Sequence, residues 1–137
     1  MTDVHNLSRQ HKEIQELLVK LNAFSTKEAI ENASFNISLL IGHLSGKINI
    51  HLSNEDKYVY PKLKESADAK TRQVSEIFSR EMGGLTNLFA DFKSKYMSST
   101  KIVANSSTFL DELHQLTRSI NKRIEKEEAE LYPLLTR

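Results

Sequence analysis

Apolar residues recur at steps of three and four along much of the chain, which is the spacing of one face of an α-helix. The four segments that show this spacing are residues 4–21, 37–55, 78–96 and 109–127. The alternation of period two that is typical of strands is absent from them. Glycine and proline, which interrupt helices, are also few: there are four glycines and two prolines. The pattern therefore predicts an all-α protein.

Local signals suggest where these helices begin and end. Thr2 or Asp3 can cap the first helix, and residues 66–68 (Ser-Ala-Asp) open the third. The residue before a proline is pushed away from helical geometry, so we expect the second helix to end or kink near Tyr60 and the fourth near Tyr132.

The second half of the sequence repeats the first. The stretch HLSNEDKYVYPKL (residues 51–63) matches RIEKEEAELYPLL (residues 123–135), with a glutamate, a Tyr-Pro pair and a leucine in common at a constant shift of 72 residues. The first and third segments align with a shift of 71, placing SRQHKEIQELLVKL over SREMGGLTNLFADF. A helix pair written twice with short loops predicts an antiparallel up-down-up-down four-helix bundle with pseudo-twofold symmetry, forming one domain over residues 1–137.

Composition narrows the classes of function. The 137 residues suit a single domain, and 19 basic against 18 acidic residues leave no net field to attract nucleic acid or an anionic membrane. The chain has no cysteine, which excludes disulfides, zinc-thiolate sites and thiol catalysis. Because we find neither a membrane-length apolar run nor a signal-peptide pattern, we expect a soluble cytoplasmic protein.

Five polar residues interrupt the apolar stripes, namely His11, His51, Glu55, Arg123 and Glu127. A histidine and a glutamate four residues apart lie one turn apart on the same helix face, so an imidazole and a carboxylate can converge on one ion. Burying them without a partner would be costly. Two imidazoles and two carboxylates suit iron, manganese or zinc better than calcium or magnesium. The alternatives are an ordinary surface histidine, an intrahelical hydrogen bond and a solvated salt bridge.

With these residues the chain resembles the hemerythrin-like, or HHE cation-binding, proteins. The resemblance runs from His11-Lys-Glu-Ile through HLSNEDKYVYPKL to EKEEAELYP. It implies a four-helix bundle that holds two iron ions between its helices. It also implies that His11, His51, Glu55 and Glu127 occupy four of the family's ligand positions.

Two positions depart from the family pattern. Met82 stands where the third helix should supply a histidine, and Arg123 replaces the histidine of the fourth helix. In the family, each ion has its own histidine ligands and the two glutamates are shared. The resemblance therefore implies that this chain keeps all ligands of one ion and loses the histidines that bind only the other. Methionine is a poor ligand in an oxygen and nitrogen site, and arginine offers no lone pair. We expect the Arg123 guanidinium to take the second ion's place and to bridge Glu55 and Glu127.

Several functions follow from this interpretation. The first is a protein that holds one ion, iron before zinc or manganese, and binds or senses dioxygen, nitric oxide or metal. The second is a metal-free bundle without any cofactor, in which Arg123 replaces the metal and the protein serves regulation or interaction. Glu81 is a candidate substitute carboxylate beside Met82. Catalysis ranks last, because no nucleophile or substrate pocket is evident. A protein partner or a homodimer stays open.

Overall fold

The computed structural model describes residues 4–136, and every regular element in that range is helical. The all-α prediction is therefore confirmed for the described residues. The elements are, in chain order, α1 (Val4–Asn22), α2 (Lys27–Asn32), α3 (Ser34–Asn54), a π-helical turn (Glu55–Val59), α4 (Tyr60–Lys64), α5 (Ala69–Tyr96), α6 (Ser99–Ala104), α7 (Ser106–Lys126), a second π-helical turn (Glu127–Leu131) and a 3-10 helix (Tyr132–Thr136). The capping residues predicted for the first helix, Thr2 and Asp3, lie outside the described residues.

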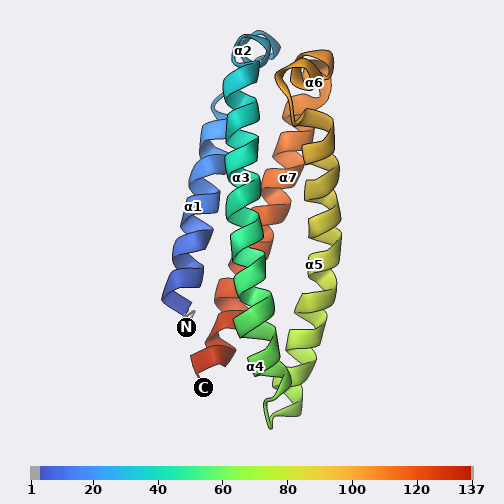
Figure 1. Cartoon of the computed structure of the whole chain (residues 1–137). Helices are drawn as coiled ribbons and strands as arrows, with labels where there is room; N and C mark the ends of the chain where they lie inside the picture. The colour runs from blue at the N-terminus through green and yellow to red at the C-terminus, as the bar shows by residue number, and fades with distance from the viewer. Residues whose placement is uncertain (1–3, 137) are drawn as a thin grey trace.

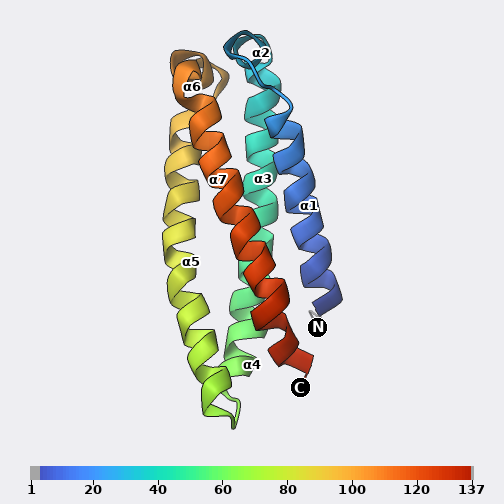
Figure 2. The same cartoon turned by 180° about the vertical axis from the view of Figure 1, so that it is seen from behind.

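The four longest helices, α1, α3, α5 and α7, lie lengthwise beside one another (Figures 1 and 2). The short helices α2 and α6 sit together at one end, while α1 begins and α7 ends toward the other end (Figure 1). None of the helices within residues 4–136 has both the length and the apolar character needed to cross a bilayer.

The internal repeat is visible in the element boundaries. The elements α2, α3 and the first π-helical turn correspond to α6, α7 and the second π-helical turn, each pair offset by 72 residues. The repeat also includes the caps, because the Thr26 side chain accepts from the backbone N–H of Ala29 and the Ser98 side chain accepts from that of Lys101. The sequence patterns did not predict α2 and α6, since six residues are too few to show a helical stripe.

Helix boundaries near the prolines differ from a simple end. The helical path continues beyond Tyr60 as α4, with Pro61 in its first turn, where a missing N–H costs least. Beyond Tyr132 the chain continues as a 3-10 helix. The kinks expected near these tyrosines take the form of π-helical turns that precede them. At the start of α5, Asp68 accepts from the backbone N–H of Lys70, as the sequence predicted.

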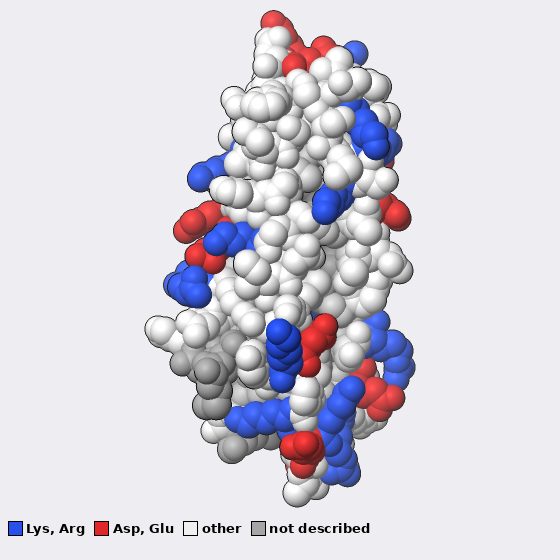
Figure 3. Space-filling view, viewed as in Figure 1, with Lys and Arg blue, Asp and Glu red and all other residues white. Residues whose placement is uncertain are grey.

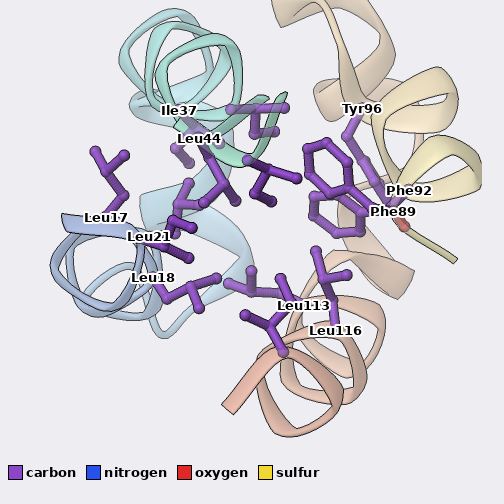
Figure 4. Close-up of a cluster of buried hydrophobic side chains, with 14 of the residues drawn as sticks. Leu17, Leu18, Leu21, Ile37, Leu44, Phe89, Phe92, Tyr96, Leu113 and Leu116 are labelled. Atoms are coloured by element: carbon purple, nitrogen blue, oxygen red, sulfur yellow. The ribbon is translucent and has the colours of Figure 1, made fainter. Parts of the chain in front are cut away.

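The apolar stripes form two separate clusters of buried side chains. The larger cluster extends along the four long helices, and Figure 4 shows its leucines and isoleucines facing the aromatic group of Phe89, Phe92 and Tyr96. The smaller cluster lies around Leu7, Phe78 and the segments that follow the two π-helical turns. In the sequence, most of the polar stripe residues lie between members of the two clusters. Their side chains are buried, so the two clusters shield them from bulk water.

Candidate metal centre

The four predicted ligand residues meet in the space between the two apolar clusters. His11 comes from α1, His51 from the last turn of α3, and Glu55 and Glu127 from the first residues of the two π-helical turns. All four side chains are buried, with at most 5 % of each residue exposed. One ligand atom from each lies within 4.8 Å of those of the others. The structure therefore brings together four side chains that are distant in the sequence.

Three of the four distances inside this group match those between ligands of a single ion, and the fourth, between His11 and Glu127, is shorter. The Nε2 atoms of His11 and His51 are 3.0 Å apart, and His51 Nε2 lies 3.2 Å from Glu55 Oε2. Glu127 Oε1 lies 2.7 Å from His11 Nε2 and 3.3 Å from His51 Nε2. Two atoms that each lie about 2.1 Å from one ion are roughly 3.0–3.4 Å apart, for octahedral or tetrahedral angles. The donor set and its spacing thus fit one transition-metal ion.

One atom in the group has no partner. Glu55 Oε1 is fully buried and makes no hydrogen bond among the described residues. A buried carboxylate oxygen without a donor is costly, and such atoms are rare in native proteins. A cation between the four side chains would satisfy it. Because this oxygen is unpaired, the four residues fit a bound ion better than a closed hydrogen-bond network.

Each histidine is held from outside by an acceptor. His51 Nδ1 lies 2.8 Å from Oε1 of the buried Gln10, and His11 Nδ1 lies 2.9 Å from Oε1 of Glu128. An acceptor at Nδ1 fixes that nitrogen as the N–H donor, which leaves Nε2 free to offer its lone pair to a metal. Both imidazoles are therefore oriented with their ligand nitrogen toward the shared space.

The two π-helical turns determine which side chains follow the glutamates. In each turn the backbone N–H of the tyrosine bonds to the carbonyl of the glutamate five residues before it, so Tyr60 pairs with Glu55 and Tyr132 with Glu127. In an α-helix a residue five positions on would point well away from the glutamate's face. The wider turn brings each tyrosine back toward the buried layer. Single π turns inside α-helices are frequent at functional sites.

Tyr132 completes the group on the side of the two histidines. Its hydroxyl donates to Glu55 Oε2 at 2.8 Å and lies 3.1 Å from both Glu127 Oε1 and His11 Nε2. Its ring stacks on that of His11, with the centroids 5.3 Å apart. Burial and the two carboxylates raise the pKa of Tyr132 above its ordinary value, so the phenol stays protonated and acts as a donor.

The two carboxyl groups have opposite electrostatic environments. Burial raises the pKa of Glu55, and the neighbouring Glu127 adds to this effect. Burial also disfavours ionised Glu127, but hydrogen bonds from His11 and His51 outweigh it and hold the pKa of Glu127 well below its usual range. For His51, burial lowers the pKa, whereas hydrogen bonds and charge from Glu127 and Glu55 raise it to about 9. Without a metal, protonated His51 and Arg123 thus bring positive charge to this layer.

Arg123 lies on the opposite side of Glu127. Its Nε donates to Glu127 Oε2 at 2.8 Å, and its two terminal nitrogens donate to the Tyr60 hydroxyl at 2.8 Å and to the backbone carbonyl of Phe78 at 3.0 Å. The guanidinium carbon stands 4.8 Å from the centre of the Phe78 ring. Burial lowers the pKa of Arg123, but the charge of Glu127 outweighs that effect, and the pKa is raised.

The expectation that Arg123 bridges both glutamates is wrong in one respect. Among the residues that the structure describes, Arg123 bonds to Glu127 but makes no hydrogen bond to Glu55. The reason is geometric, because its bonds to the Tyr60 hydroxyl and the Phe78 carbonyl fix the orientation of the planar guanidinium. Glu55 faces Tyr132 and His51 instead.

The two other candidate residues lie outside the group of four. Met82 is half-buried and lines a cavity together with His11, His51, Arg123 and Glu127. Glu81 is exposed on α5 and pairs with Lys126, with Oε2 and Nζ 3.2 Å apart, so the structure does not bring it to the centre. The remaining histidines, His5, His43 and His114, are exposed and lie away from the centre.

Four residues of the site were not singled out from the sequence: Gln10, Tyr60, Glu128 and Tyr132. Gln10 and Glu128 directly adjoin the predicted ligands His11 and Glu127 in the sequence. A stripe on one helix face does not include such neighbouring residues. The tyrosines did carry a signal, namely their repetition at the same distance from Glu55 and Glu127. Without the π-helical turns, that distance pointed to packing at helix ends.

A cavity of about 70 Å³ adjoins the centre. His11, His51, Arg123 and Glu127 form its polar wall, and the rest of its lining is mostly apolar, including Ile14, Ile48, Met82, Leu85, Phe89, Ile120 and Ile124. Such a volume admits a few atoms but no extended substrate. A small ligand could therefore approach the imidazoles from the side of the larger apolar cluster.

Comparison with known protein families gives one match. The family model described as the hemerythrin HHE cation binding domain matches residues 2–135, which is nearly the whole chain. Neither the curated proteins nor the solved structures give a significant match.

Proposed function

Since the chain belongs to the hemerythrin HHE cation-binding domain family, we propose that it holds a single divalent metal ion between His11, His51, Glu55 and Glu127. The ligand atoms of these residues already lie within 4.8 Å of one another. The observation that carries the proposal is the unpaired, fully buried Glu55 Oε1 beside two imidazoles whose Nε2 atoms converge. A cation between the four side chains would satisfy this oxygen.

A single ion, rather than two, is supported by Arg123. Its guanidinium bonds to Glu127 Oε2 on the side away from the histidines, and it cannot act as a ligand. At this short range it would also repel a second cation. We therefore assign to the guanidinium the positive charge that a second ion would contribute.

Iron is the ion we propose, with zinc and manganese as the alternatives. A site of two imidazoles and two carboxylates suits all three metals. Iron in such a site supplies a centre with affinity for dioxygen and nitric oxide. The adjoining cavity of about 70 Å³, with its mostly apolar lining, is large enough for a diatomic molecule. We propose binding or sensing of such a gas, or of the metal itself, in a cytoplasmic protein.

The architecture we propose for this function is a single antiparallel four-helix bundle with pseudo-twofold symmetry over residues 1–137. The 72-residue offset between α3 and α7, and between the two π-helical turns, supports it. In this interpretation α2 and α6 are short connections at one end of the bundle. The symmetry axis then relates the His11–His51 side to the Met82–Arg123 side.

A specific observation favours a second candidate, a metal-free bundle that serves regulation or interaction. The hydroxyl of Tyr132 and the protonated His51 already provide donors to Glu55, while Arg123 and His11 pair with Glu127. Only Glu55 Oε1 is left without a partner among the buried atoms of the centre. In this state Arg123, the two histidines and the two glutamates form a buried ion network in which only Glu55 Oε1 is unsatisfied.

Metal content decides between the two. The protein would be produced without an affinity tag under iron supplementation, and its metal content and absorption spectrum compared with those of His51→Ala. We expect about one ion per chain in the natural protein and almost none in the variant, since the removal of one of four ligands weakens the affinity of the site for the ion. His43→Ala, which removes an exposed histidine of the same helix, should leave the metal content unchanged. Metal-free natural protein would establish the second candidate instead.

A further inference from the structure

The outward face of α3 differs from every other outward helix face of the described chain. It exposes Phe35 (66 % exposed), Leu39 (57 %) and Ile50 (56 %), with Gly42 and Gly46 between them on the same side of the helix. We call this set of five residues the α3 face. Figure 3 shows a mostly uncharged surface over the upper part of α3, with the charged side chains gathered toward its flanks.

The internal repeat provides a control for this face. The positions on α7 that correspond to Phe35, Leu39, Gly42, Gly46 and Ile50 are, in the same order, Ser107, Asp111, His114, Arg118 and Lys122. All five are exposed. Of its 21 residues, α7 has seven that are charged, whereas α3 has one, Lys47. The fold therefore does not require an apolar surface at these positions, and α3 has one for another reason.

Packing within the chain does not account for the glycines of the face. A Cβ atom built on Gly42 or Gly46 would meet no atom within 4 Å. Glycine is the least favourable residue in a helix interior apart from proline. Between the large side chains at either end, the two glycines leave the helix backbone uncovered by side chains. A second helix could approach it at close range.

From these observations we propose that two copies of this chain associate through their α3 faces, about a twofold axis that passes between Gly42 and Gly46. A twofold contact uses the same patch on both partners. The helices then cross in opposite directions, which places Leu39 of one copy near Ile50 of the other, twice. Lys47 does not oppose this contact, because its Nζ turns toward Glu13 of α1 at 3.4 Å.

Charge complementarity favours a second copy over a different face of the same protein. The corresponding surface of α7 carries Asp111, Arg118 and Lys122, and apolar residues placed against these charges would leave them desolvated. No other described helix exposes more than one large apolar side chain, so a second α3 face offers the best apolar match within this protein. Head-to-tail chains are thereby disfavoured, and a closed dimer results.

The length of α3 sets the scale of this contact. A 21-residue helix is about 32 Å long and about 10–12 Å wide with its side chains, so the α3 face buries roughly 350 Å² per copy. A total of roughly 700 Å² corresponds to a weak, reversible contact rather than to a permanent one. We therefore expect a dimer that forms at high micromolar concentrations and dissociates on dilution.

Sedimentation at a series of high micromolar concentrations tests the proposal. The natural protein should sediment as a dimer, and both Leu39→Asp and Gly46→Arg, which introduce the residue types found at the corresponding positions of α7, should weaken association at least tenfold. Val19→Lys, at another exposed apolar position but on α1, should leave the dimer intact. Helical content and thermal stability show whether each variant is folded. A monomeric natural protein, or a dimer that survives both variants, would overturn the proposal.

Mixing two variants tests the direction of the crossing. Ile50→Lys should also be monomeric, but an equimolar mixture with Leu39→Asp should form a heterodimer, since the new aspartate lies near the new lysine across the axis. In a dimer of either variant alone, each new charge would instead lose its water against an apolar residue of the other copy. Failure of the mixture to associate would overturn the twofold arrangement between Gly42 and Gly46. Metal content should be the same in all these variants, so this result is independent of the metal proposal.

Discussion

Arg123 shows how a single side chain can distinguish the chemistry of the two halves of the repeat. At the corresponding position in the first half stands His51, whose Nε2 faces the other ligands. Arg123 instead directs three donors at Glu127, Tyr60 and the Phe78 carbonyl. A residue that could share a metal is thus replaced by one that neutralises a carboxylate permanently, since arginine stays protonated at any accessible pH.

Removing this guanidinium should destabilise the protein strongly. In Arg123→Ala, Glu127 loses its partner at Oε2, and the buried Tyr60 hydroxyl and Phe78 carbonyl lose a donor. Breaking a buried charge pair from one side costs about 3–5 kcal/mol of unfolding free energy. Urea denaturation of the metal-free protein measures it. Arg118→Ala, at an exposed position of the same helix, should change the value by less than about 0.5 kcal/mol.

Restoring the missing ligands should restore a second metal site. The double variant Met82→His/Arg123→His supplies two imidazoles on the side of Glu127 that the guanidinium now occupies, and it removes the fixed charge. We expect the iron content to rise from about one toward two ions per chain, with a matching change in absorption. Met82→His alone should stay near one ion, because the guanidinium remains. An unchanged content in the double variant would contradict the assignment of Arg123 to the second ion's place.

Tyr132 and Tyr60 are related by the internal repeat but should differ in their effects. The Tyr132 hydroxyl touches Glu55 and Glu127, so Tyr132→Phe removes a contact that orients both proposed ligands. Loss of such outer contacts lowers metal affinity about 10–100-fold. Tyr60→Phe removes an acceptor of Arg123, so it should lower stability by about 1–3 kcal/mol with little change in affinity. Competition with a chelator of known affinity, beside urea denaturation, separates the two effects.

Residues on one helix face were predictable from the sequence, and residues beside it were not. His11, His51 and Glu127 were found because they interrupt an apolar stripe of period 3.6. Gln10 and Glu128 each adjoin a ligand, and their sequence neighbourhood is polar, so nothing marked them. The partner of Arg123 was predicted correctly for Glu127 and incorrectly for Glu55. A charge pattern gives the sign of the partner's charge but not which of two nearby carboxylates the guanidinium reaches.

At the scale of elements, the short helices and the π-helical turns complete the repeat. Each π-helical turn begins at one of the buried glutamates and is followed by a tyrosine, so the irregularity coincides with the site. The long helices were predictable because each has enough turns to show its stripe. A π turn of five residues is too short to show a period of its own, and so the sequence indicated only a helix end or kink at each Tyr-Pro pair.

The caps of α2 and α6 should contribute equally to stability. Thr26 accepts from Ala29 N–H at 3.1 Å and Ser98 from Lys101 N–H at 3.2 Å. Thr26→Ala and Ser98→Ala should each lower the unfolding free energy by about 1 kcal/mol, since a backbone donor loses its acceptor. Ser25→Ala, an exposed position just before the first cap, is the control and should be nearly neutral. A clear difference between the two caps would show that the repeat is not equivalent in energy at this end.

At the scale of the whole molecule, two apolar clusters enclose one polar layer. The larger cluster extends along the four long helices, and a domain of this length can bury enough surface to fold without an ion. We therefore expect the protein to stay folded without a metal, unlike small domains that unfold when their metal is removed. On the single-ion proposal, the same cluster lets Arg123 stand in the place of a second ion without loss of the fold.

Metal should consequently raise the melting temperature of a protein that is already folded. An ion at about a thousand times its dissociation constant adds about 4 kcal/mol, which corresponds to a rise on the order of 10 °C for a domain of this size. Calorimetry of the metal-free protein with and without added iron measures the rise, and a chelator should abolish it. His51→Ala should keep a cooperative transition but show no such rise, because the imidazole that lies nearest to His11 is gone. If chelation leaves the melting temperature of iron-supplemented natural protein unchanged, the buried ion network of Arg123, the histidines and the glutamates is the working state of the molecule.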